Sequence, residues 1–387
     1  MTMERLDWAA QRSAVEQPQP TAEAETRRAL HLCNVCGYCN GLCPVFDAAK
    51  RRPLLAGGDL DQLANLCHHC RSCFYACQYA PPHPFALNLP RALARTRADS
   101  YARHAWPQPL AQLFAHPQRA ALLASLITTL PLLLLVLISG PVDQVWAVHQ
   151  GPGAFYQVLP WGWMVLLAGL SLGWSLVALG VGVRRFWRAG AGADDHALLP
   201  QGRRRSALKT ALLEALALSH LRGGGAGCAD LDATPSLWRR RWHHALFYGF
   251  LLSFAATVAA TLYHHLLGRL APYPVWSAPV LLGSVGGLLM LMGVIGLGSL
   301  RARADPEPNR PATQSANQAL LWLLGAVALS GLLLLLWRET AAMALLLILH
   351  LGLVLALFLL LPYSKLVHAP YRLAALWRDA LERQQRG

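Results

Sequence analysis

Charged residues are scarce in this sequence. Asp, Glu, Lys and Arg make up 14% of its 387 residues, whereas 55% are hydrophobic. Such an apolar composition, distributed unevenly along the chain, excludes a single soluble globule and indicates a protein that lies mostly in a membrane. Residues 1–30 also lack the apolar run of a secretory signal. We therefore expect the N-terminal part to remain in the reducing cytoplasm, where disulfides are rare.

Several motifs of soluble enzymes are missing as well. The glycine-rich stretch 223–227 is not followed by the Lys and Ser or Thr of a phosphate loop. Neither a dinucleotide-binding fingerprint nor a nucleophile paired with a base is present, so we expect any organic chemistry to belong to a partner protein. The net charge of +14 comes from Lys and Arg that gather beside apolar stretches. This pattern indicates membrane topology and argues against nucleic-acid binding.

Eight of the nine cysteines fall into two runs of identical spacing, C-x2-C-x2-C-x3-C. The first run is Cys33, Cys36, Cys39 and Cys43, and the second is Cys67, Cys70, Cys73 and Cys77. This spacing holds a [4Fe-4S] cluster, and its duplication predicts two clusters. Zinc fits less well because structural zinc takes its ligands as separated pairs. Cys228, the ninth cysteine, is interpreted as a free thiol.

The fourth cysteine of each run ligates the other cluster in two-cluster ferredoxins. We therefore assign Cys33, Cys36, Cys39 and Cys77 to one cluster, and Cys67, Cys70, Cys73 and Cys43 to the second. One departure from the usual pattern is that Gln78, and not proline, follows the second run. The crossed ligation predicts that the two clusters lie close together.

Six later stretches are long and apolar enough to span a bilayer, which takes about 20 helical residues. They are Ala120–Ser139, Pro160–Val183, His244–Leu267, Ala278–Leu300, Ala319–Trp337 and Ala341–Pro362. Arginines gather between the second and third stretches and between the fourth and fifth, whereas residues 140–159 contain no Lys or Arg. The positive-inside rule then places both termini in the cytoplasm, on the side expected for the cysteine runs.

Histidines inside apolar stretches are costly and are usually functional. His350 lies well inside the sixth stretch, and His368 follows five helical turns later, about 27 Å along the axis if the helix continues through Pro362. A kink at this proline is the alternative. The third stretch carries His243 and His244 at its start and a second doublet, His264 and His265, at its end. The two stretches run in opposite directions, so we expect one histidine from each stretch at each of two depths in the membrane. Two imidazoles are the usual axial ligands of haem b. The doublets alone are equally well explained as interfacial residues. No C-x-x-C-H motif is present, so the haem is not expected to be covalently attached.

Five stretches together resemble the tricarballylate (citrate) utilisation protein B family of membrane iron-sulfur and haem proteins. They are Cys33–Pro44, Cys67–Pro90, Gly223–Cys228, His243–His265 and Pro362–Arg372. The last stretch is also similar to the gamma-type haem b subunits of nitrate reductase. The resemblance implies that the protein reoxidises the flavin of an FAD-dependent dehydrogenase that acts on an organic acid such as tricarballylate. It favours His264 over His265 and leaves the first doublet open. Our ligand set is His244, His264, His350 and His368, with His243 and His265 as alternates.

The fold predicted from the sequence is mainly α. We expect a mobile lead-in over residues 1–25, followed by a cytoplasmic ferredoxin-like domain with two [4Fe-4S] clusters over 26–118. A six-span haem domain then covers 119–368 and includes a cytoplasmic loop at 184–243. Residues 369–387 are expected to form a cytoplasmic tail. The predicted function is that of an oxidoreductase subunit in a bacterial-type inner membrane, without an organic-substrate site of its own. It passes electrons through the clusters and one or, as we expect, two haems to quinone. The alternatives are a subunit of a heterodisulfide or sulfite reductase type of complex and a membrane redox sensor.

Overall fold

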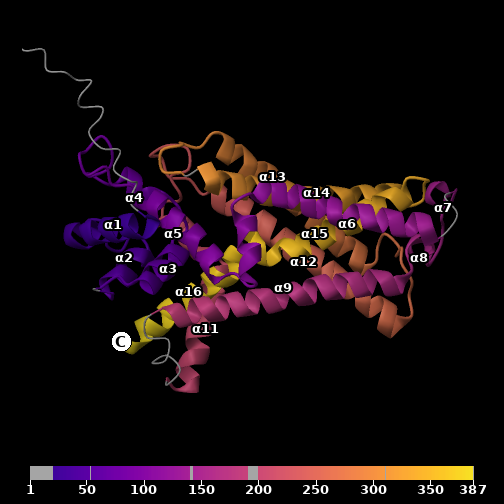
Figure 1. Cartoon of the computed structure of the whole chain (residues 1–387), viewed down its shortest axis with the longest axis horizontal. Coiled ribbons are helices and arrows are strands. Elements are labelled where there is room, and N and C mark those ends of the chain that lie inside the picture. The colour runs from indigo at the N-terminus through magenta and orange to yellow at the C-terminus, as the bar shows by residue number, and fades with distance from the viewer. Residues whose placement is uncertain (1–20, 53, 140–142, 191–198, 310, 387) are drawn as a thin grey trace, which may run out of the picture.

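The computed structural model describes residues 21–52, 54–139, 143–190, 199–309 and 311–386. The expected lead-in over 1–25 falls almost entirely outside these residues. Within them the regular elements are helices, with one isolated bridge between Cys228 and Ser236. The molecule is elongated, with the cysteine-bearing part at one end and six long helices along the long axis (Figure 1). The mainly α fold predicted from the sequence is therefore confirmed.

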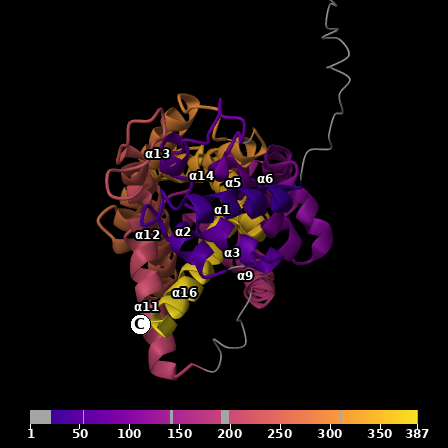
Figure 2. The same cartoon turned by 90° about the vertical axis from the view of Figure 1, so that its left-hand side faces the viewer.

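The cysteine-bearing part is a cluster of short helices. These are α1 (Ala22–Cys36), α2 (Pro44–Lys50), α3 (Gly57–Leu66), α4 (Ser72–Tyr75) and α5 (Leu89–His104). Leu30, Leu60 and Leu63 are fully buried at its centre. Asp59 is the third residue of α3, and its Oδ2 accepts a hydrogen bond from the Ala56 N–H at 3.2 Å. The short helices face the viewer in the end-on view, in front of the long helices (Figure 2).

The six expected spans all form long helices, and these are apolar enough to cross a membrane. They are α6 (Pro117–Ser139), α9 (Trp161–Ala189), α12 (Trp238–Leu267), α13 (Ala278–Ala302), α14 (Pro311–Trp337) and α15 (Met343–Leu360). Large apolar side chains cover their outer faces, including Ile127 at 65% and Ile295 at 66% exposure. Outward-facing apolar residues on helices of this length identify a membrane-associated protein.

Small residues fix how α12 lies on α13. A Cβ at Gly293 would lie 2.6 Å from Leu246 Cβ, and one at Gly296 would lie 2.2 Å from Trp242 Cδ2. Such close backbone contact between membrane helices requires glycine. The contact with α13 therefore sets the rotation of α12 about its own axis.

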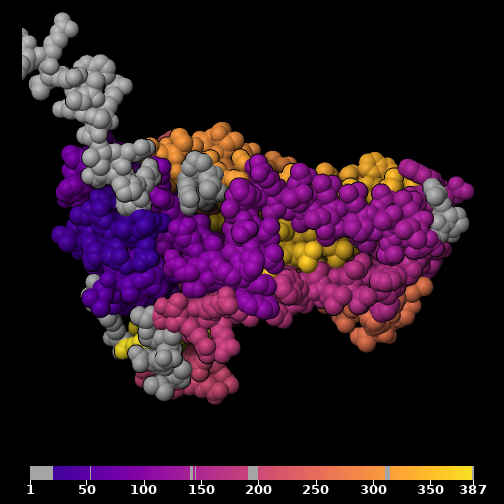
Figure 3. All heavy atoms as spheres, viewed as in Figure 1, coloured from indigo at the N-terminus to yellow at the C-terminus, as the bar shows by residue number. Residues whose placement is uncertain are grey.

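On the other side of the bundle α15 packs between α6 and α9, where its surface remains visible (Figure 3).

The sixth span does not continue as one helix to His368. After α15 the chain forms two short 3-10 turns, η3 (Leu361–Tyr363) and η4 (Lys365–Val367), separated by Ser364 with extended backbone angles of φ −122° and ψ −178°. The continuous five-turn helix assumed from the sequence is therefore wrong. The proline at 362 lies in η3 and has no N–H with which to continue the helix. The helix α16 (His368–Arg386) then starts in a new direction.

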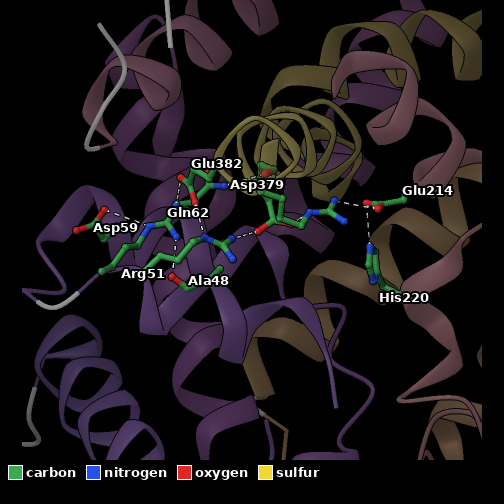
Figure 4. A network of polar contacts seen from close by, with 11 residues as sticks. Ala48, Arg51, Asp59, Gln62, Glu214, His220, Asp379 and Glu382 are labelled. Atoms are coloured by element: carbon green, nitrogen blue, oxygen red, sulfur yellow. Dashed lines mark hydrogen bonds and ion pairs between the residues drawn. The ribbon is translucent and has the colours of Figure 1, made fainter. Parts of the chain in front are cut away.

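The segment expected to be a C-terminal tail is the helix α16, packed against the cysteine-bearing part. Ala375, Leu376 and Leu381 are at most 1% exposed. A polar network joins α16 to α2 and α3 (Figure 4). Arg51, at the end of α2, pairs with Asp379 and Glu382 of α16, and Arg52 pairs with Glu382 as well. Gln62 Nε2 of α3 donates a hydrogen bond to the Ala375 carbonyl at 2.7 Å. On its other side Arg383 lies 2.9 Å from Glu214 of α11 (Gln201–Leu216). Through α16, elements from both ends of the chain form one unit.

We expect Glu382→Leu to destabilise this unit by about 3 kcal/mol, because it leaves the cations of Arg51 and Arg52 without their shared carboxylate in a mostly buried site. The thermal midpoint of the purified protein should fall, and α16 should become accessible to protease. Glu339→Leu is the matched control, since its carboxylate is 72% exposed and lies 3.8 Å from Arg338. Equal midpoints for the two variants would show that the network does not stabilise α16.

Candidate iron-sulfur and haem sites

The eight clustered cysteines surround two neighbouring cavities. Cys33, Cys36, Cys39 and Cys77 line the first, together with Cys73 at its edge. Cys43, Cys67, Cys70 and Cys73 line the second. Apart from Cys73, which lines both cavities, the first cavity gathers three thiols of the first run and the last thiol of the second. The second cavity gathers three thiols of the second run and the last thiol of the first. These are the two sets that the crossed ligation predicts, and the shared Cys73 shows that the cavities are adjacent.

The thiols lie at helix ends because the loops between the short helices turn there. Cys36 ends α1, and Gly37 follows it with a φ of +66° that favours glycine. Cys43 precedes the first residue of α2, and Cys67 follows the last residue of α3. In this way helices α1, α2 and α3 hold the cysteine loops against one another.

The electrostatics of the two sets fit a metal cluster. Burial and the neighbouring thiols raise the pKa of Cys33 to about 12 and that of Cys39 to about 11. The pKa of Cys43 and that of Cys73 are also raised, again mainly by burial and then by adjacent thiols. Thiolates held so close together need positive charge between them, which iron ions supply. Among the described residues no three His, Cys, Asp or Glu side chains could hold a single metal ion.

Three arginines hold the backbone of the second cysteine loop. The carbonyl of Cys67 accepts hydrogen bonds from Arg97 Nη1 at 2.5 Å and from Arg372 Nη2 at 2.8 Å. The carbonyls of His68 and His69 accept from Arg239 Nη2 and Nη1 at 3.3 and 2.6 Å. We refer to Arg97, Arg239 and Arg372 as the arginine clamp. Sequence reasoning attributed such arginines to membrane topology and missed this role.

The two histidines of this loop are buried between the cations of the clamp. Burial and nearby arginines lower the pKa of His68 and that of His69 well below the usual value, so both rings are neutral. The His68 Nδ1–H donates to the Leu66 carbonyl at 2.7 Å, and His69 Nε2 lies 3.1 Å from Asn309 Oδ1. These contacts shape the loop, and both histidines line the second cavity beside its cysteines.

The glycine-rich stretch packs against the same loop. Gly223 and Gly224 have φ values of +51° and +85°, and a Cβ on Gly224 would lie 2.6 Å from Leu42 Cδ1. The Ala229 N–H donates to the Cys70 carbonyl at 2.9 Å. Cys228 is fully buried, and burial raises the pKa of its thiol to about 12. The stretch covers the second cavity, and its ninth cysteine is an unreactive thiol.

At the end of the bundle that is nearer the cysteine loops, which we call the inner level, His243 and not His244 lies next to His368. The ring centroids of His243 and His368 lie 6.3 Å apart at an interplanar angle of 75°. His244 points the other way, with Nε2 3.2 Å from the Ala217 carbonyl. The choice of His244 from the sequence is therefore corrected to His243, because adjacent residues on a helix face directions about 100° apart.

This histidine pair fits the axial ligands of a haem. The His368 Nδ1–H donates to the Lys365 carbonyl at 2.5 Å, which leaves Nε2 as an acceptor and is the usual arrangement behind a metal-bound imidazole. The Nδ1 of His243 is buried without a hydrogen-bond partner. Burial, together with Arg372 and Lys365, lowers the pKa of His368 well below its usual value and keeps the ring neutral, as metal binding needs. Each helix also carries a clamp residue one turn away, since Arg239 precedes His243 and Arg372 follows His368.

The outer histidines have separate partners. His264 stacks on Trp161 with centroids 4.8 Å apart, and its Nδ1 lies 3.3 Å from the Tyr156 hydroxyl. His350 Nδ1 lies 3.0 Å from Ser330 Oγ, while His265 is exposed. In the part of the chain that the structure describes, no ring contact joins the His264 and His350 imidazoles. The facing outer pair expected from the sequence is therefore not formed, because α12 packs on α13 while α15 packs on α6, α9 and α14.

Comparisons with known proteins identify two matching family models. The model described as "Citrate utilization protein B" matches residues 115–387, and "Citrate utilization protein B Fer4-like domain" matches residues 26–103. A curated relative, "Citrate utilization protein B" of Escherichia coli, is 38% identical over 364 residues, which covers 94% of this chain and 93% of the relative. No solved structure gives a significant match.

Proposed function

The chain belongs to the citrate utilization protein B family, and on this premise we propose that it moves electrons from a cytoplasmic flavoprotein dehydrogenase to membrane quinone. Its Fer4-like part makes it an iron-sulfur electron-transfer protein of the citrate utilisation type. We propose two [4Fe-4S] clusters and haem b as the carriers. The partner's flavin is oxidised, quinone is reduced, and no organic acid binds to this chain.

The crossed cysteine sets carry the cluster assignment. Cys33, Cys36, Cys39 and Cys77 hold one cluster, and Cys43, Cys67, Cys70 and Cys73 hold the second. The first cavity is nearer the surface, since Cys36 is exposed, whereas the second lies beneath the glycine-rich stretch and the arginine clamp. Cations beside a cluster favour its reduced, more negative form. We therefore expect electrons to enter at the first cluster and to settle on the second.

An exposed apolar patch supports entry at the first cluster. Val35 is 89% exposed, Tyr38 is 74% exposed and Phe85 is 47% exposed. Val35 and Tyr38 flank the exposed Cys36 in the sequence, and Tyr38 lines the first cavity with it. Exposed apolar groups beside a redox centre are typical of a docking site for another protein. We place the flavoprotein on this patch.

The arginine clamp is the observation on which the haem assignment rests. Arg239 and Arg372 bond the loop of the second cluster, and His243 and His368 lie one helical turn from them. The helices that present the imidazole pair are thus the helices that grip the cluster loop. Haem bound there receives electrons from the second cluster over a short, rigid connection. We propose His243 and His368 as its axial ligands.

The orientation in the membrane follows from the arginines. Arg239 and Arg301 belong to the end of the bundle that holds the cysteine-bearing part, and α7 (Asp143–Trp146) and α8 (Ala154–Val158) form the other end (Figure 1). Positively charged loops stay in the cytoplasm. We therefore propose an inner-membrane protein whose termini and clusters are cytoplasmic.

Optical and EPR spectra of the anaerobically purified protein test this function. After dithionite reduction we expect sharp b-haem bands together with EPR signals of two interacting [4Fe-4S] clusters, and reoxidation of both by an added quinone. The haem-to-iron ratio distinguishes one haem from two. Cluster signals without a haem band would refute the haem assignment. Spectra of both cofactors without reoxidation by quinone would instead agree with a redox sensor.

A further inference from the structure

A large cavity lies between α13 and α14, beside the loop that joins them. Its volume is about 880 Å³, and it is open on one side. The polar and loop residues of its lining are Arg301, Ala302, Ala304, Pro306, Gln314 and Gln318. Leu291, Val294, Trp322 and Leu329 continue it along the two spans. The cavity is thus polar at one end and apolar along its length, and its volume is in the range that holds a small organic ligand.

The polar end contains Arg301, and one nitrogen of its guanidinium group has no hydrogen-bond partner among the described residues. Nη1 of Arg301 is buried and makes no hydrogen bond among the described residues. Gln318 Oε1 accepts from Gln118 Nε2 at 3.1 Å, which leaves its own amide donors for a ligand. A buried guanidinium nitrogen without an acceptor costs free energy, so we expect a ligand at this end to bring an acceptor group.

The loop that walls the cavity is bound to the second cysteine run. Asp305 Oδ2 accepts from the Tyr75 hydroxyl at 2.6 Å, and Asn309 Oδ1 accepts from Arg71 Nη2 at 3.1 Å. Arg71 lies between the ligands Cys70 and Cys73, and Ala304 and Pro306 of the same loop line the cavity. A ligand at the polar end is therefore close to the second cluster.

We propose that this cavity is the quinone site, an inference that rests on the proposed function. Arg301 and Gln318 donate hydrogen bonds to the carbonyl oxygens of the quinone ring, and the isoprenoid tail leaves along α13 and α14. A phospholipid fits less well, because an anionic headgroup is usually held by several cations, whereas Arg301 is the single cation among the described residues of the lining. In each turnover the quinone takes two electrons, delivered one at a time by the reduced centres, and two protons from water at the cytoplasmic end. The product is the quinol.

Gly298 makes a sharp test possible. It lines the cavity, and a Cβ built on it meets nothing within 4 Å. Gly298→Phe should therefore fill the cavity without displacing the protein. Gly180→Phe is the matched control, because Gly180 is an exposed glycine of α9 that also has nothing within 4 Å. Arg301→Gln removes the cation and leaves the cavity open, so it is a second, independent variant.

The experiment starts from dithionite-reduced protein freed of excess reductant. We measure its anaerobic reoxidation by decylubiquinone in a stopped-flow instrument, with ferricyanide as a small soluble oxidant that needs no site. We expect Gly298→Phe to slow the quinone reaction at least about tenfold, with the ferricyanide rate and the cofactor spectra unchanged. Gly180→Phe should behave as the wild type, and Arg301→Gln should need more quinone for half-maximal rate.

The outcomes separate the site from the function. Wild-type quinone rates in both Gly298→Phe and Arg301→Gln would overturn the site and leave the proposed function intact. Wild-type protein that ferricyanide oxidises and decylubiquinone does not would overturn both. Native mass spectrometry adds a readout that does not depend on turnover. A phospholipid lost from Gly298→Phe, together with an unchanged quinone rate, would make the cavity a lipid site and overturn the inference.

Discussion

Replacing Cys77 by Ser should abolish the EPR signal of the cluster held by the first cysteine run, although Cys77 belongs to the second run. The reason is that Cys77 lines the cavity of Cys33, Cys36 and Cys39. Cys43→Ser should damage the other cluster in the same way, because Cys43 lines the cavity of Cys67 and Cys70. Oxygen from serine is a poor substitute for thiolate, which soft iron-sulfur centres prefer. We expect loss of most of the affected signal and of electron transfer to the haem.

The control for this pair is Cys228→Ser. Cys228 is more buried than the proposed ligands, but it lines neither cavity, and its Sγ lies 3.4 Å from the Leu221 carbonyl. Both clusters should persist in this variant. The crossed arrangement is contradicted if Cys77→Ser affects only the cluster of its own run. Iron analysis accompanies the EPR spectra, so that loss of a cluster is not confused with a change in its spin state.

Replacing His368 by Ala should remove the inner haem, and His243→Ala should do the same. Either change removes one of the two imidazoles whose centroids lie 6.3 Å apart. We expect the haem content at this site to fall at least about tenfold, measured by the reduced b-band absorbance per protein. The cluster signals should remain, since Arg239 and Arg372 still hold the cysteine loop.

His244→Ala serves as the matched control for the haem prediction. Its ring is bonded to the Ala217 carbonyl and not to the facing helix, so we expect wild-type haem content. The opposite result, with haem lost from His244→Ala and kept in His243→Ala, would sink the assignment made from the structure and restore the one made from the sequence.

The sequence predicted the elements whose signal is local. Cysteine spacing determines which thiols share a loop, and span length determines which helices can cross a membrane, so the two cavities and the six long helices were expected at nearly the observed positions. The choice between His243 and His244 depends instead on how α12 is rotated. That rotation follows from the contacts of Gly293 and Gly296 with α12, which are long-range and leave no periodic signal.

The break before His368 and the arginine clamp were missed for a related reason. Pro362 indicated a kink, but the extended Ser364 that redirects the chain has no strong sequence signature. Arg239 was counted as a topology signal, and Arg97 and Arg372 were given no role, because charge alone does not specify a hydrogen-bond partner. Two of these arginines could have been found from their spacing in the sequence. Arg239 lies one helical turn before the candidate haem ligand His243, and Arg372 lies one turn after His368.

The arginine clamp also bears on the order of assembly. Burial and Arg97 lower the pKa of Arg372 to about 10, and Lys365 nearby is affected in the same direction. These cations repel one another around a loop whose thiols, without iron, are neutral. A cluster bound by four thiolates carries net negative charge. It therefore attracts these cations and offsets their mutual repulsion. We therefore expect α16 and the start of α12 to close on the cysteine loop only after the second cluster is inserted, so that iron supply controls maturation of the haem site.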